Sequence, residues 1–295
     1  MRRKWRDLPA FLLFVLPAMI IFMAFYAYPI LKGFVYAFTD WNSFLDTPSF
    51  VGFSNFRELA SDEWVRTAMK NNLILTVVVV IMQNAFAVIF AVILNQKLKG
   101  MEIFRAVIFL PVLLSTAVIS YIWSYMYSPL SGVIGPFMSS IGLDHLSKVD
   151  WLGDPKYSML SISAVLIWEY TGYSMVIYLA GLKTIPSDLY EAGEIDGAGR
   201  WTQFRRITLP LLAPSITINS VIAVIGCLKQ FDQVYLLTGG GPAHKTETFG
   251  TLIYNIAFQS QRLGYGTSIA LVMTIGICII SAVQYAILSR REVHY

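Results

Sequence analysis

One acidic side chain, Glu169, lies in the middle of the otherwise apolar run 158–182. A charge at the centre of a membrane-spanning helix costs about 2.5–3.5 kcal/mol on insertion scales, so such a group usually faces a cavity or a partner. Tyr170 and Tyr173 follow it, and a spacing of four places Glu169 and Tyr173 on one helix face. A carboxylate accepts hydrogen bonds from hydroxyl groups, and an aromatic ring stacks on the apolar C–H face of a sugar. The group therefore indicates a carbohydrate-facing site, while a structural hydrogen bond between helices is the alternative that the sequence leaves open.

Other polar residues recur inside apolar runs, at spacings typical of one helix face. In the run 211–235, Asn219, Ala223, Cys227 and Gln230 fall at intervals of four, four and three. Thr116 is a further polar position, in the run 106–127. Such residues either line a path through the membrane or hydrogen-bond one helix to another. The candidate substrate path consists of Thr116, Glu169, Tyr170, Tyr173, Asn219 and Gln230.

The elements that must position these residues are apolar runs long enough to cross a membrane. Apolar residues make up 56% of the 295-residue chain and charged residues only 14%, which is outside the usage of soluble proteins. A bilayer's hydrocarbon core is about 30 Å thick, so a helix needs roughly 20 apolar residues to cross it. Such runs occur at about 10–30, 71–94, 106–127, 158–182, 211–235 and 264–288. The sequence predicts an all-α membrane protein of six transmembrane helices, forming a single domain over residues 1–295.

The distribution of basic residues predicts the orientation of these spans. Thirteen of the 22 lysines and arginines lie in four short segments that alternate with longer loops. They are Arg2, Arg3, Lys4, Arg6, Lys97, Lys99, Arg105, Lys183, Arg200, Arg205, Arg206, Arg290 and Arg291. Basic residues concentrate in short loops on the cytoplasmic side of a membrane. Both termini and the loop 183–210 are therefore expected in the cytoplasm.

The loop 183–210 is the most elaborate polar segment of the chain. Pro186 and Ser187 are good residues for starting a helix, which is expected to run over 188–195 and to end at Asp196. A second amphipathic piece is expected over 200–207. Small residues in the loop let another surface approach the backbone closely; they are Ala192, Gly193, Gly197 and Ala198. The loop is either an amphipathic element on the membrane surface or a docking element for a cytoplasmic partner.

The loop resembles a known motif. Glu191-Ala192, then three residues, then Asp196-Gly197-Ala198, with Leu209-Pro210 and Pro214 beyond, is similar to the EAA motif of the membrane subunits of bacterial binding-protein-dependent ABC importers. The stretches IPSDLYEA before it and LTGGGP before the last span are similar to the carbohydrate branch, of maltose, multiple-sugar and glycerol-3-phosphate type. The third residue of the EAA triplet is Gly193 instead of alanine, which keeps a small side chain there.

This resemblance implies a type I (MetI-like) importer permease fold in the bacterial cytoplasmic membrane. Its loop would be the coupling element that docks on a cytoplasmic ATPase through Glu191, Ala192, Gly193, Asp196, Gly197 and Ala198. The implied partners are a second homologous permease, two ATPase subunits, an extracytoplasmic sugar-binding protein, the lipid bilayer and a carbohydrate substrate. The chain itself would need no cofactor, because ATP and magnesium would bind the ATPase.

No stretch of the sequence carries a catalytic signature. Residues 239–246 resemble the phosphate loop G-x-x-x-x-G-K-[ST], but His244 stands where the second glycine is required and no strand precedes it. The three histidines are far apart and both cysteines lie in apolar runs, so no metal site or disulfide is expected. The net charge of +4 is dispersed over short segments, which does not favour a nucleic-acid partner. We expect a protein that is not an enzyme; the alternatives are an ion-coupled secondary sugar transporter and an intramembrane enzyme.

Overall fold

The computed structural model describes residues 8–42, 44, 47–96 and 99–291. Across those ranges the regular elements are all helices, joined by turns and loops, and one isolated bridge links Thr39 and Phe50. The predicted all-α class is therefore confirmed. Several basic residues used for the orientation lie outside the described residues, namely Arg2, Arg3, Lys4, Arg6 and Lys97. The chain forms two compact units, Met1–Asp62 with Ile253–Thr274 and Glu63–Leu252 with Ile275–Tyr295.

The first unit contains the N-terminal helical segment and a polar cluster. Helices α1 (Leu8–Phe22) and α2 (Tyr28–Tyr36) are joined by the π-helical turn Met23–Ala27. The turn lies just before Pro29, which has no N–H to donate to the helix. In the same unit, helix α3 (Ser54–Ser61) places Glu58 in a bidentate ion pair with Arg262, at 2.8 and 2.7 Å. Tyr265, in the first turn of α16 (Leu263–Leu288), donates a 2.6 Å hydrogen bond to Asp62.

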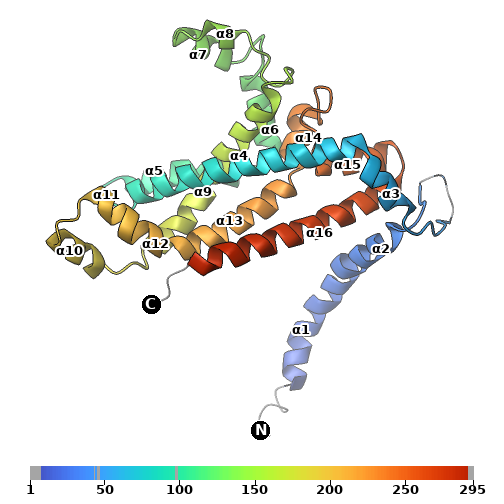
Figure 1. Ribbon diagram of the computed structural model, residues 1–295, viewed down its shortest axis with the longest axis horizontal. Coiled ribbons are helices and arrows are strands. Elements are labelled where there is room, and N and C mark those ends of the chain that lie inside the picture. The colour runs from blue at the N-terminus through green and yellow to red at the C-terminus, as the bar shows by residue number, and fades with distance from the viewer. Residues whose placement is uncertain (1–7, 43, 45–46, 97–98, 292–295) are drawn as a thin grey trace. The chain divides into compact units, whose positions relative to one another are not determined.

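The second unit is built on the pairing of α4 (Glu63–Leu94) with α9 (Ser158–Leu182), against which α13 (Ala213–Leu228) packs (Figure 1). Its apolar core has two clusters. One surrounds Leu75, Ile162 and Val234, and the other surrounds Ala87, Tyr178 and Leu212. Both clusters include residues of α4 and α9, so these two helices form the scaffold on which the rest of the unit is placed.

The remaining elements of this unit are short. They are α5 (Met101–Phe109), the 3-10 turn Leu110–Leu113, α6 (Thr116–Met126), α7 (Ile134–Ser140), α8 (Asp144–Ser147), α10 (Asp188–Ile195), α11 (Arg200–Gln203), the π-helical turn Phe204–Thr208, α12 (Leu209–Leu211) and α14 (Asp232–Thr238). Helix α15 (Phe249–Tyr254) and the π-helical turn Asn255–Gln259 continue into the first unit. Helices α7 and α8 lie in the segment before the N-terminal end of α9, and α10 lies in the segment after its C-terminal end (Figure 1).

Two of the six predicted spans are not straight. Among the described residues, four helices are long and apolar enough to cross a membrane alone: Leu13–Tyr36, Glu63–Leu94, Ser158–Leu182 and Leu263–Leu288. Six spans result if each of two bent pairs counts as one, Met101–Leu113 with Thr116–Met126 at 98° and Arg200–Leu211 with Ala213–Leu228 at 64°. The predicted span at 106–127 thus contains the first bend, and the predicted span at 211–235 begins at the second.

Local backbone chemistry explains both bends. In the third span, Leu114 and Ser115 are extended, and the Ser115 hydroxyl accepts a 3.4 Å hydrogen bond from the Val118 N–H at the start of α6. In the fifth, Pro214 lies in the first turn of α13, where it provides no N–H and crowds the preceding turn. That span also ends early, because α13 stops at Leu228 and α14 begins only at Asp232.

A buried asparagine ties three elements of the second unit together. Asn72 of α4 donates to the carbonyl oxygens of Cys227 and Leu228, at 3.3 and 3.0 Å, and accepts from the Phe249 N–H at 2.8 Å. Its side chain thereby satisfies carbonyl groups at the end of α13 and the N–H group at the start of α15.

We predict that Asn72→Leu lowers the free energy of unfolding by about 3 kcal/mol, because it leaves buried backbone groups without partners. The measurement is unfolding in mixed detergent micelles, followed by circular dichroism. Asn95→Leu, an exposed asparagine just beyond α4, is the matched control and is expected to unfold like the unsubstituted chain. Equal stability of the Asn72 variant would contradict the bridging role.

Candidate functional site

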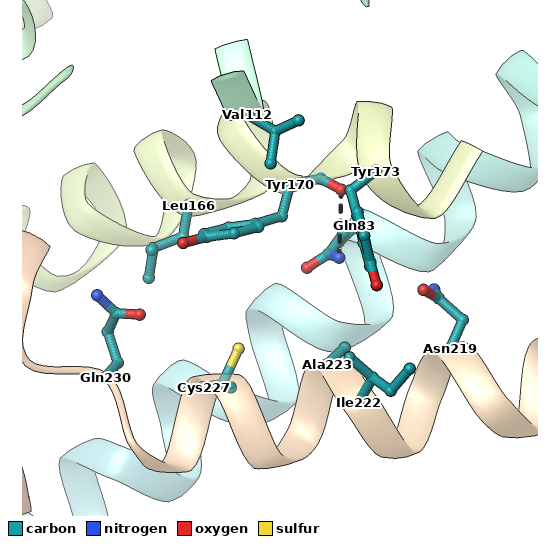
Figure 2. A pocket seen from close by; sticks show the side chains of 11 residues that line it. Gln83, Val112, Leu166, Tyr170, Tyr173, Asn219, Ile222, Ala223, Cys227 and Gln230 are labelled. Carbon is teal, nitrogen blue, oxygen red and sulfur yellow. Dashed lines mark hydrogen bonds between the residues drawn. The ribbon is translucent and has the colours of Figure 1, made fainter. Parts of the chain in front are cut away.

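A cavity of about 330 Å³ lies among α4, α9, α13 and the 3-10 turn after α5 (Figure 2). Its lining is mainly apolar and aromatic, with amide groups at separate points. The lining residues are Gln83, Val112, Leu166, Tyr170, Tyr173, Asn219, Ile222, Ala223, Gly226, Cys227 and Gln230. None of these described lining residues is a carboxylate, lysine, arginine or histidine. The cavity thus combines aromatic rings with uncharged hydrogen-bonding groups, which is typical of sites for small polar ligands.

Four of the six candidate path residues meet at this cavity. Tyr170 and Tyr173 reach it from α9, and Asn219 and Gln230 from α13 and the residues just after it. The whole predicted stripe of α13 lies along the wall, because intervals of four, four and three residues keep side chains on one face of a helix. The predicted ligand-binding role of these residues stays a prediction.

Glu169 and Thr116 do not line the cavity. Glu169 is 2% exposed, and its Oε2 accepts a 2.6 Å hydrogen bond from Nε2 of Gln233. Glu169 and Tyr173 are one turn apart on α9, as expected, but the carboxyl group of Glu169 is directed at Gln233 of α14 and only Tyr173 lines the cavity. Thr116 is the first residue of α6 and lies outside the cavity wall.

The sequence interpretation missed a polar group on α4. Gln83 lines the cavity and donates through Nε2 to Ser174 Oγ at 2.7 Å and to the Tyr170 carbonyl at 3.4 Å. Next to it, Asn84 accepts from Nδ2 of Asn219 at 2.9 Å and from the Tyr178 hydroxyl. The signal that could have found this group is the pair of adjacent amide residues, Gln83 and Asn84, in an otherwise apolar run.

The loop after α9 forms two short helices joined by a tight turn. Helix α10 covers Asp188–Ile195, as predicted, and its end is marked by Gly197 with φ of +75°. A left-handed conformation of this kind favours glycine. Glu191 and Ala192 are exposed on the helix, and the apolar side chains of Ile195 and Trp201 are 87% and 72% exposed. The loop therefore presents a carboxylate beside an unusual amount of uncovered apolar surface.

The small residues of this loop serve its own packing as well. A Cβ added at Gly193 would lie 3.2 Å from Cδ1 of Ile207 and 3.9 Å from the Ala198 side chain. The Tyr190 and Thr208 hydroxyl groups are 3.0 Å apart and connect the first helix to the π-helical turn. Gly193 and Ala198 were expected to leave room for a partner. In the structure both are half-buried within the loop, so their small size also serves the packing of the loop itself.

Comparison with known proteins assigns the chain to a family. A family model described as "Binding-protein-dependent transport system inner membrane component" matches residues 4–294. The chain belongs to this family. The chain is 35% identical over 271 residues to a probable ABC transporter permease protein of Pyrococcus horikoshii, covering 92% of each. It is 34% identical over 280 residues to the multiple sugar-binding transport system permease protein of Streptococcus mutans, covering 95% of each.

A solved structure has the same fold as this chain. It is a chain of a bacterial alginate ABC transporter in complex with an alginate pentasaccharide-bound periplasmic protein. The TM-score is 0.83 and the sequence identity 25%, over 96% of this chain and 94% of that one. The importer permease fold expected from the EAA-like residues is therefore confirmed.

Residues 239–246, which resemble a phosphate loop in sequence, do not form one in the structure. It follows helix α14 instead of a strand, and Gly239 ends that helix with φ of +62°. Gly240 lies against a carboxylate, since a Cβ there would be 2.8 Å from Oε2 of Glu247. Glu247 is 1% exposed and would repel a phosphate group at this position.

Proposed function

We propose that this chain is the membrane-spanning permease subunit of an ATP-driven carbohydrate importer and forms half of its translocation pathway. The observation that carries the proposal is the cavity inside a fold shared with ABC importer permeases, lined by two tyrosines and three amide side chains. Aromatic rings and uncharged amides suit the C–H faces and hydroxyl groups of a sugar. The similarity to a multiple sugar-binding transport system permease supports the same substrate class.

The proposed substrate is a neutral sugar. No charged side chain is found among the lining residues, and the one carboxylate of α9 turns away from the cavity. An acidic substrate such as the alginate of the solved relative would need a cation to neutralise it here.

The energy would come from a separate protein that docks on the loop after α9. The support is chemical: the exposed apolar side chains of Ile195 and Trp201 suit the core of a protein interface, and the Glu191 carboxylate suits its polar rim. The contact residues in this proposal are Glu191, Ala192, Asp196 and Gly197, with Gly193 and Ala198 shaping the loop beneath them. ATP and magnesium would bind two cytoplasmic ATPase subunits.

The rest of the assembly follows from the same proposal. A second, homologous permease would supply the other half of the pathway, and an extracytoplasmic sugar-binding protein would deliver the sugar. The solved relative is in complex with a periplasmic protein, which supports the last partner. Both termini and the docking loop would face the cytoplasm of a bacterium, in accordance with the concentration of basic residues in these segments.

Co-purification with uptake measurement tests this function. The tagged chain is extracted in mild detergent from the cells that naturally express it, and its partners are identified by mass spectrometry. We expect an ATPase, a second permease and a binding protein, and import of a neutral sugar into proteoliposomes only with ATP inside. Import driven by an ion gradient without ATP would favour the secondary transporter instead.

We also predict that Tyr173→Ala lowers the maximal rate of sugar import about tenfold, because it removes a ring that covers the ligand. Tyr173→Phe keeps the ring and is expected to retain at least half of the rate. Both variants are measured in the same proteoliposomes, with the amount of inserted chain as reference. Equal loss in both would mean that the hydroxyl group, and not the ring, is what the cavity needs.

A further inference from the structure

The three amide side chains at the cavity share one orientation. In each of them the NH₂ group donates hydrogen bonds to other groups of the protein. Gln83 donates to Ser174 and to the Tyr170 carbonyl; Asn219 donates to Asn84 and, at 3.0 Å, to the Tyr178 hydroxyl; Gln230 donates to Oε1 of Gln233. Their carbonyl oxygens have no hydrogen-bond partner within the part of the chain that the structure describes. Figure 2 shows the oxygens of Gln83 and Gln230 on the cavity side. The cavity therefore offers hydrogen-bond acceptors at three separate points.

For Gln230 this orientation depends on a carboxylate outside the cavity. Gln233, at the start of α14, is 1% exposed and stands between Gln230 and Glu169. Oε2 of Glu169 accepts the hydrogen bond from Nε2 of Gln233, so the NH₂ group of Gln233 points toward Glu169. Its carbonyl oxygen then faces Gln230, which must donate in turn. The three side chains Gln230, Gln233 and Glu169 thus form a row in which each amide donates to the next residue, and the acceptor at the end, Glu169, sets this order.

We infer that Glu169 is a positioning residue, which acts through Gln233 to hold the carbonyl oxygen of Gln230 in the cavity as an acceptor for a sugar hydroxyl. The inference rests on the proposed function for the identity of the ligand, but the row of three side chains exists without it. It also explains why a carboxylate is present in a membrane-spanning helix although it does not touch the cavity. A ligand with several hydroxyl donors suits these acceptors, and a ligand that lacks the hydroxyl facing Gln230 is disfavoured.

Exchanging the side chains of Glu169 and Gln233, singly and together, gives a direct test of this inference. In Glu169→Gln, the new amide can either accept from Gln233 or donate to it, so the reversed row, in which the Gln233 NH₂ group turns toward Gln230 and draws the Gln230 oxygen out of the cavity, becomes accessible. In Gln233→Glu, two carboxylates face each other where the present bond measures 2.6 Å. In the double variant, a glutamate at 233 accepts from both neighbours, so Gln230 keeps its original orientation.

The transporter is assembled in proteoliposomes with its partner permease, ATPases and binding protein, and ¹⁴C-labelled maltose, lactose and raffinose serve as probes. For Glu169→Gln we expect the number of sugar molecules imported per ATP hydrolysed to fall about twofold or more, with recovery to the unsubstituted value in the double variant. Loss of folding or assembly would lower import and ATP hydrolysis together, so the ratio separates positioning from structure. Glu63→Gln, an exposed carboxylate at the start of α4, is the matched control and should leave the ratio unchanged.

Thermal unfolding of the detergent-solubilised permease chain provides a measurement that needs no sugar. We expect Gln233→Glu to lower Tm and the double variant to restore it, because only the single variant buries two adjacent carboxylates. An unchanged Tm in Gln233→Glu, or no recovery in the double variant by either measurement, would overturn the inference. If the unsubstituted assembly imports none of the probes, the neutral-sugar proposal fails, and the Tm cycle still decides whether the row of hydrogen bonds exists.

Discussion

Replacing Glu191 by alanine is expected to lower ATP-driven import at least tenfold while the amount of chain in the membrane stays the same. The carboxylate is exposed on α10, and within the described residues no side chain forms a hydrogen bond or ion pair with it. Its removal therefore costs this chain little stability. If an ATPase places a basic group against it, the loss of a charge-assisted hydrogen bond of about 1.5–3 kcal/mol weakens the docked state. Import and ATP hydrolysis are measured together in proteoliposomes.

Glu194→Ala is the control for this variant, since Glu194 is a second exposed carboxylate on the same short helix. We expect it to import at more than half of the normal rate. Unimpaired import with Glu191→Ala would remove the main support for docking at this loop. A bulky residue at Gly197 is a less clear test, because φ of +75° strains any side chain there whether or not a partner is present.

The elements of the fold could be predicted wherever a long apolar run ends in residues that stop a helix. Helix α9 ends at Leu182 and α10 covers 188–195, both as expected from the change of composition and from Pro186 and Ser187. The bends could not be predicted in the same way, because hydropathy reports the length of an apolar segment and not the direction of its axis. Proline alone does not decide it: Pro17 lies inside α1, while Pro214 accompanies a 64° bend.

The candidate site was predictable on α13 and less so on α9. Asn219 and Gln230 lie at intervals that keep a helical face, so the sequence places them together. On α9, Tyr170 and Tyr173 face the cavity while Glu169 turns to Gln233, a partner 64 residues away in sequence. Residues adjacent on a helix differ by about 100° in direction, and only the packing of α9 against its neighbours fixes which of them faces the cavity. Gln83 was missed for the same reason, since its role depends on the contact between α4 and α9.

The contact of α9 with α5 has a requirement that the sequence did not reveal. Gly172 lies in the middle of α9, where a Cβ would collide with the carbonyl oxygen of Ile108 and lie 2.8 Å from the Cα of Phe109. Both neighbours are backbone atoms at the end of α5, so no side-chain rotation can relieve the overlap. The two segments can approach this closely because glycine carries no side chain, as in the small-residue contacts of other membrane helices.

We therefore expect Gly172→Leu to give no correctly packed permease, and Gly172→Ala to lower Tm by several degrees through an overpacking cost of about 1–3 kcal/mol. The measurements are the yield of monodisperse chain in detergent and its thermal unfolding. Gly276→Ala in α16, where an added Cβ meets nothing within 4 Å, is the control and is expected to leave Tm unchanged or slightly raised. Because Val112 follows Phe109 by one turn and lines the cavity beside Tyr170 and Tyr173, the alanine variant should also lose import before it loses structure. Normal import at normal stability would mean that the wall formed by the 3-10 turn does not need its close approach to α9.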